Sequence, residues 1–125
     1  MYVGWVMAYA SLWEVIRTDP SFTIVEKDRL RTTARALLAS LRTVNEEGYD
    51  LEIRDADGRR TYHGILNENS VDRIYIPGAP NAFNAIMATG IVQALAFVSE
   101  HSGDRAYADS LIDGERALLE LAERT

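Results

Sequence analysis

The chain has 125 residues, a formal net charge of -6, a sequence pI near 4.8 and no cysteine. This length supports one hydrophobic core, so we expect a single domain over residues 1–125. The acidic balance argues against a nucleic-acid partner, because affinity for phosphates comes largely from lysine and arginine. The lack of cysteine excludes disulfides, zinc-thiolate sites and thiol nucleophiles, and it is compatible with a reducing compartment.

The first segment, MYVGWVMAYASLW, carries no charge before Glu14. Its apolar residues recur at helical spacing, which predicts a helix over 2–18. The segment lacks a basic n-region and is shorter than the roughly 20 residues that a membrane span needs. We therefore expect a helix buried on most sides, no membrane partner and a cytoplasmic location.

A second helix is predicted over 23–46, with apolar residues on one side and arginines largely elsewhere. Its first residues, TIVE, have the S/T-x-x-E form of a capping box made by Thr23 and Glu26. Gly48 suits the C-terminal cap of this helix.

The apolar period then changes to alternation, which predicts a β-hairpin with its turn at Asp57-Gly58. The hairpin and the loop after it cover 49–80. A single hairpin is only marginally stable, so this one must pack on the helices or on another chain.

Two more helices are predicted over 81–101 and 104–124. Asn81 suits the N-cap of the third helix, and Asn84 can play the reciprocal part of a capping box. Gly103 suits the C-terminal cap of the third helix. Asp104 would cap the last one.

These elements form a repeat. A nearly charge-free helix followed by an amphipathic one makes a helical pair over 2–46, and the same order recurs over 81–124. In each pair the apolar pattern predicts that the first helix is buried and that the second covers it on the outside. The predicted fold is mainly α with a small β-hairpin: two antiparallel helical hairpins, four helices in all, joined by the hairpin and loop.

The segment VSEHSGDRAYADSLIDGERALLELAER resembles the passage from an inner to an outer helix in (α/α) toroid proteins, which include glycosidases and lyases. Those proteins often carry the pattern x-TGD-x-x-Y-x-D/E-x-A at this point. In this chain Ser102 replaces the usual threonine. GAPNAFNAIMATGIVQALAFV and YVGWVMAYASLWEVI resemble inner helices. Toroids close with many more helices, so the resemblance implies a toroid-like fragment. Its apolar helices need cover from within the chain or from a second copy, and we expect a two-fold homodimer.

The resemblance also implies a ligand site, commonly for a saccharide, near the loops that lead into inner helices. Tyr2, Trp5, Asn81 and Asn84 would lie together there, with rings to stack on sugar faces and amides to bond hydroxyls. The alternative is that Trp5 belongs to the core and that both asparagines are caps.

Glycoside hydrolysis needs two carboxyl groups that flank the bond. Alternation in the hairpin places Asp50 and Glu52 on one face, which we expect to be solvated. Asp55 and Asp57 suit the turn instead. Asp55 or Asp72 is nevertheless the carboxylate that a pocket with the aromatic and amide residues would use.

His63 and His101 are the only histidines. His63 lies in the hairpin, where Asp50 or Asp72 could partner it, and it is therefore a candidate ligand-binding residue. Two histidines without cysteine or metal-binding spacing predict no metal site. Without a glycine-rich nucleotide motif or a nucleophile elbow, we also expect no cofactor.

Two functions remain. The first is a small, acidic, self-associating helical module with an interaction or small-ligand role and no demonstrable catalysis. The alternative is a carbohydrate-active site of the toroid type, glycoside hydrolase-like or lyase-like, incomplete or assembled between chains. The absence of a paired catalytic motif favours the first. It predicts Tyr2 and Trp5 buried, whereas the enzyme predicts an open pocket with a carboxylate of perturbed pKa.

Overall fold

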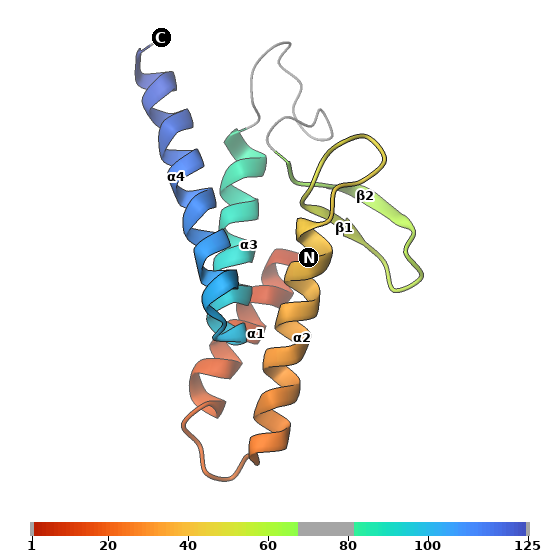
Figure 1. The fold of residues 1–125 in the computed structure, drawn as a ribbon, viewed down its shortest axis with the longest axis vertical. Helices are drawn as coiled ribbons and strands as arrows, with labels where there is room; N and C mark the ends of the chain where they lie inside the picture. The colour runs from red at the N-terminus through yellow and green to blue at the C-terminus, as the bar shows by residue number, and fades with distance from the viewer. Residues whose placement is uncertain (1, 68–81, 125) are drawn as a thin grey trace.

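The structure is a computed structural model that describes residues 2–67 and 82–124, without the side chains of 62–63, 82–83 and 115–124. These residues form four helices and a small β-hairpin, arranged as in Figure 1. The helices are α1 (Tyr2–Ile16), α2 (Ile24–Arg42), α3 (Ala82–Ser99) and α4 (Ser102–Arg124), and the strands are β1 (Glu52–Arg54) and β2 (Arg60–Ile65). The prediction of a mainly helical fold with a small hairpin is confirmed.

The helix α3 is the centre of the bundle, because α1, α2 and α4 all pack against it. In Figure 1, α1 and α3 run in one direction and α2 and α4 run in the other. The buried apolar residues of α3 are Ala85, Ala88, Ile91, Val92, Ala94, Leu95, Ala96 and Val98. They occupy several sides of the helix, as expected for a segment with almost no charge.

The helix α1 joins this core through one side. Val6 and Trp13 are fully buried there, and the Arg31 guanidinium of α2 lies 5.1 Å from the Trp13 ring centroid. The Tyr9 hydroxyl donates a hydrogen bond of 2.5 Å to the Leu30 carbonyl oxygen of α2. These contacts fix which side of α1 faces the bundle.

The predicted capping box at the start of α2 is confirmed. The backbone N–H of Glu26 donates to Thr23 Oγ1, and the backbone N–H of Thr23 donates to Glu26 Oε1, both at 3.1 Å. The two residues therefore satisfy each other's free N–H groups, which fixes where the helix begins.

The predicted end of α2 is wrong. The helix ends at Arg42, and Gly48 is not its cap but lies in a later turn with φ +86°. Asn45 builds that turn, because its side-chain Oδ1 accepts from the backbone N–H groups of Glu47 and Tyr49. A side chain that bonds its own backbone in this way competes with continued helix.

The caps predicted between α3 and α4 are also wrong. α3 ends at Ser99, and Glu100 takes the left-handed backbone conformation with φ +52°. α4 begins at Ser102, so Gly103 and Asp104 both lie inside its first turn. The chain therefore reverses direction before Gly103, the residue predicted to cap the third helix.

The hairpin is antiparallel, with a turn that contains Gly58 at φ +78°. Its register pairs are Glu52 with Ile65 and Arg54 with Arg60. β2 thus has more residues than β1 between the paired positions, which is a bulge. Gly64 lies in the bulge, where an added Cβ would meet the Thr61 side chain and the Ile53 carbonyl oxygen.

The prediction that Glu52 faces solvent is wrong, because this residue is only 5% exposed. Leu51 precedes the strand with a left-handed φ of +61° and is itself 2% exposed. Its N–H donates to the Leu41 carbonyl oxygen at 2.6 Å, and its own carbonyl oxygen accepts from Leu66 N–H at 2.9 Å. This backbone conformation interrupts the alternation, so two consecutive residues are buried.

Candidate functional site

One side of α1 is exposed although it is apolar. The side chains of Trp5, Met7, Leu12 and Val15 are 51%, 50%, 55% and 66% exposed. They lie on the sides of the helix that do not pack on the bundle. The prediction that this helix is buried on most sides is therefore wrong.

The remaining exposed positions of this surface are small or acidic. Gly4, Ala8 and Ser11 lie between the large side chains, and Glu14 is the only charged residue of α1. Ser11 Oγ donates to the Met7 carbonyl oxygen at 3.0 Å. We call this surface the α1 outer face and define it by Gly4, Trp5, Met7, Ala8, Ser11, Leu12, Glu14 and Val15.

Three aromatic rings lie along the edge of the α1 outer face that is nearer to α2. The rings of Trp5 and Tyr9 stack with centroids 5.3 Å apart and an interplanar angle of 16°, and Tyr2 lies 6.3 Å from Trp5. Burial raises the pKa of both tyrosines, and for Tyr9 a hydrogen bond with Thr33 partly offsets that rise. Trp5 is thus held by partly buried neighbours while half of it faces solvent.

The structure does not bring the predicted saccharide residues together as an open pocket. Tyr2 is partly buried against the core, whereas Trp5 lies on the outer face. Asn84 is fully buried, and its Nδ2 is 3.3 Å from each of the carbonyl oxygens of Ile65 and Asn67. Asn84 therefore ties α3 to the end of β2. Two other predicted residues, Asn81 and Asp72, lie outside the described residues.

Asp55 shapes the hairpin turn. Its Oδ1 accepts from the backbone N–H groups of Asp57 and Arg59, and its Oδ2 accepts from Arg59 Nε at 2.9 Å. His63 lies in β2, and its side chain is not among those described. Of the two alternatives for Asp55, the geometry therefore fits the turn former.

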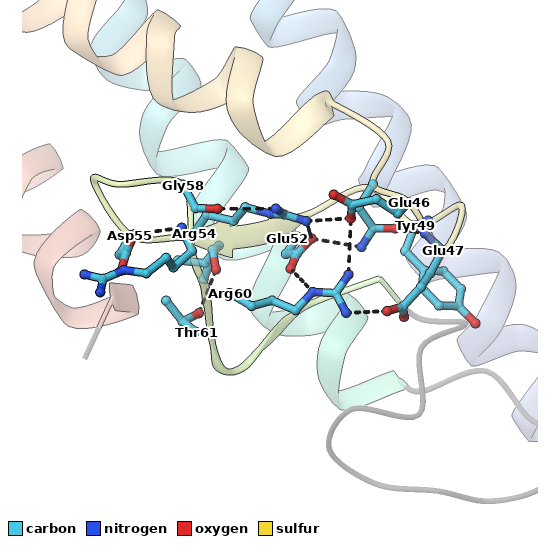
Figure 2. Close-up of polar contacts among 12 residues, drawn as sticks. Glu46, Glu47, Tyr49, Glu52, Arg54, Asp55, Gly58, Arg60 and Thr61 are labelled. Atoms are coloured by element: carbon cyan, nitrogen blue, oxygen red, sulfur yellow. Dashed lines mark hydrogen bonds and ion pairs between the residues drawn. The ribbon is translucent and has the colours of Figure 1, made fainter.

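The buried carboxylate of Glu52 is the centre of a polar network (Figure 2). It accepts from Asn45 Nδ2 at 2.9 Å, from Arg54 Nη2 at 3.0 Å and from Arg60 Nε at 2.9 Å. The same guanidinium groups reach outward: Arg54 contacts Glu46 at 2.7 Å, and Arg60 contacts Glu46 and Glu47. We call these six residues the Glu52 network, and it joins the hairpin to the segment after α2.

Burial alone would raise the pKa of Glu52. The hydrogen bonds from Asn45 and Arg54, together with the charges of Arg54 and Arg60, outweigh burial and hold the pKa of Glu52 below its ordinary value. The hydrogen bonds to glutamates raise the pKa values of Arg54 and Arg60. The carboxylate is therefore a bonded anion, unlike a general acid, whose pKa must be raised.

Two open grooves lie beside these elements. One, of about 550 Å³, is lined by Ser40, Thr43, Val44, Asn45, Glu46, Glu52, Arg54 and Gly58. The other, of about 440 Å³, lies between α2 and the start of α4 and is lined partly by Arg35, Arg42 and His101. Asp104 lines it too, with Oδ2 at 3.8 Å from Arg35 Nε and 3.9 Å from His101 Nδ1. Among the described residues of the predicted saccharide site, none lines either groove.

Within residues 2–67 and 82–124, no three side chains of metal-binding type are grouped so that they could hold an ion. None of the helices in the described part of the chain combines the length and apolar character that a membrane span requires. Comparison with protein-family models, curated proteins and solved structures found no match to this chain.

Proposed function

We propose that the chain is a small helical interaction module that self-associates through the α1 outer face. The observation that carries this proposal is the group of four large apolar side chains of one helix, each at least 50% exposed. They present roughly 400 Å² of apolar surface, which is the size of patch that often marks an interaction site on a soluble protein. Covering this surface releases water from it and so favours association.

The chemistry of the α1 outer face favours a protein partner over a lipid surface. Helices that lie on membranes carry lysine and arginine on the polar face, which attract anionic lipids. The one charged residue of α1 is Glu14, and the whole chain has a net charge of -6. A second copy offers the same apolar side chains without requiring a basic partner.

Two copies would bury on the order of 1,000 Å² in total, close to the lower limit for specific interfaces. Association also costs translational and rotational freedom, which offsets much of the gain from burial. The proposed dimer is therefore reversible, with a dissociation constant in the micromolar range. Its population depends on the protein concentration.

One substitution and a matched control test this proposal. Val15→Gln replaces a valine of the α1 outer face that is 66% exposed, and Val25→Gln replaces a valine of α2 that is 62% exposed. Both changes are expected to leave the free energy of unfolding within about 0.5 kcal/mol, as is usual for surface substitutions. Light scattering over a concentration series should show wild type and Val25→Gln dimerising and Val15→Gln shifted toward monomer. Equal masses for the two variants would refute the role of α1.

A second candidate function, a saccharide site of the toroid type, is supported by two observations. Trp5 stacks on Tyr9 and keeps half of its surface in solvent, and an aromatic ring held in this way can stack on a sugar ring. The enclosure of α3 by its three neighbours also fits the inner helix of a toroid. Titration with soluble oligosaccharides, followed by tryptophan fluorescence, tests this candidate. Quenching that Trp5→Ala abolishes would favour it over the module.

A further inference from the structure

We infer that the two copies pair through α1 in the antiparallel direction, about a two-fold axis that passes midway between Tyr9 and Ala10. This inference rests on the proposed self-association and names its geometry. Three features of the α1 outer face support it: the sizes of the side chains along its centre, the residues on its two flanks, and the position of its one charge.

The central line of the face is complementary to itself in size. Gly4, Ala8, Ser11 and Val15 follow one another at spacings of four, three and four residues and so lie on one line along the helix. An antiparallel pairing about the stated axis places Gly4 opposite Val15 of the second copy, and Ala8 opposite Ser11. A Cβ added at Gly4 would meet nothing within 4 Å, so that position has room for the valine. The small pair at the centre allows the two helices to approach closely.

The flanks of the face pair equally well. A two-fold axis brings each flank against the same flank of the other copy. On the flank nearer to α2, Trp5 then packs beside Leu12 of the second copy, and this contact occurs twice. On the other flank Met7 lies beside Glu14 of the second copy, where the methylene groups of the glutamate cover the thioether and the carboxylate reaches solvent.

The antiparallel direction keeps the two Glu14 charges apart, and the sizes of the central residues favour it over the parallel direction. In the antiparallel pair the two Glu14 residues are nine positions apart along the helix axis, which is about 13 Å at the rise of an α-helix. That separation exceeds the screening length of about 8 Å at physiological ionic strength. A parallel two-fold pair would bring each flank against the opposite flank, so it would also keep the two carboxylates apart, but it would put glycine opposite glycine at residue 4. The parallel pair therefore has a gap at residue 4, which valine fills in the antiparallel pair.

Cysteine cross-linking tests the direction directly, because the chain has no cysteine of its own. Gly4→Cys and Val15→Cys are made as separate proteins and treated with a short bis-maleimide, alone and as a mixture. In the antiparallel pair residue 4 of one copy faces residue 15 of the other, while equal residues are about 16 Å apart along the axis. We expect a covalent dimer in the mixture and at least a fivefold lower yield with either protein alone. Thr32→Cys, at an exposed position of α2, is the control for random collision.

The outcomes separate this inference from the proposal on which it rests. Efficient cross-linking of Gly4→Cys to itself would show a parallel pair, which overturns the inference and leaves self-association standing. Yields at the Thr32→Cys level, with the light-scattering mass still rising with concentration, would place the interface elsewhere. That result overturns both the inference and the role of α1. Light scattering of each cysteine protein before cross-linking identifies any variant that has lost dimerisation through the substitution itself. If one has, Met7→Cys mixed with Glu14→Cys replaces the pair, because these residues lie side by side across the antiparallel pair while the two Glu14 positions are about 13 Å apart along the axis. A mixture that gives no more product than the average of the two proteins alone overturns the inference.

Discussion

Trp5 and Tyr9 lie one turn apart on α1 with their rings stacked at a centroid distance of 5.3 Å, yet they have different surroundings. Tyr9 is fixed to the bundle by its hydrogen bond to the Leu30 carbonyl oxygen, whereas Trp5 is 51% exposed. The boundary between the packed and the open side of α1 therefore runs between these two residues. A large rigid ring at such a boundary is suited to a protein interface, where tryptophan is enriched.

The size complementarity of the α1 outer face gives the first prediction. Gly4→Val should weaken dimerisation about tenfold, because the added side chain meets Val15 of the second copy. Val15→Ala should also weaken it, since it removes buried apolar surface. An equimolar mixture of the two variants should associate more tightly than Gly4→Val alone, because in the mixed pair one contact joins valine to alanine and the other keeps glycine against valine. Sedimentation velocity of the three samples measures this, and a mixture no tighter than either variant would contradict the pairing.

The second prediction concerns the charge of Glu52. Glu52→Gln retains the shape of the side chain but takes a charged acceptor from Arg54 and Arg60. Hydrogen bonds to charged groups contribute about 1.5–3 kcal/mol each, and the partial exposure of both arginines reduces that figure. We expect the free energy of unfolding to fall by about 1–3 kcal/mol at pH 7. Asp57→Asn is the control, because this exposed carboxylate also contacts an arginine at 2.9 Å and should change stability by less than about 0.5 kcal/mol.

The third prediction concerns how the stability difference between wild type and Glu52→Gln depends on pH. The folded pKa of Glu52 is lowered from its ordinary value of 4.5, so the unfolded chain takes up this proton first as the pH falls. The stability that the charge contributes is therefore complete above about pH 4.5 and is lost as the pH falls through the lowered folded pKa. Urea denaturation from pH 7 to pH 3 should show the gap between wild type and Glu52→Gln narrowing below that value. A gap of constant size would mean that the charge is not what stabilises the hairpin.

Gly64 gives the fourth prediction. A Cβ at this position would fall against Thr61 Oγ1 and within 2.7 Å of the Ile53 carbonyl oxygen. Gly64→Ala should therefore destabilise the protein by about 1–3 kcal/mol, because the bulge must shift to make room. Gly90→Ala is the matched control: the added Cβ meets nothing within 4 Å, and alanine is favoured over glycine in a helix by about 1 kcal/mol. Thermal unfolding that ranks the two variants equally would contradict the close approach in the bulge.

Features encoded in short sequence patterns could be predicted, and those that depend on a neighbour could not. The capping box of Thr23 and Glu26 needs only two residues at fixed spacing, and it is confirmed. The end of α2 could not be placed, because Asn45 stops the helix by bonding its own turn while apolar spacing continues past it. In the hairpin, Leu51 takes a left-handed conformation that no propensity rule assigns to leucine, and the burial of Glu52 follows from it.

The α1 outer face shows the same limit at the level of the site. Uniform apolar character predicts burial, but it does not say which side of a helix lacks a neighbour. Met7, Leu12 and Val15 were therefore not identified as candidate site residues, although Trp5 was. The line of small residues from Gly4 to Ser11 was the available signal, because small side chains on an apolar helix favour close approach of another helix. Asn84 was predicted as a cap or a ligand-binding residue, whereas its amide bonds carbonyl oxygens in β2 and beyond, which spacing along α3 cannot reveal.

The most direct test of the account is the solvent exposure of Trp5 over a dilution series. Trp13→Phe leaves Trp5 as the single tryptophan, and acrylamide quenching then reports only on the α1 outer face. If this face is the interface, quenching is strong at low micromolar concentration and falls several-fold, with a blue shift of the emission, as the light-scattering mass rises above 14.0 kDa. If the mass rises while quenching of Trp5 stays unchanged, or if the mass remains at 14.0 kDa at every concentration, the account is contradicted.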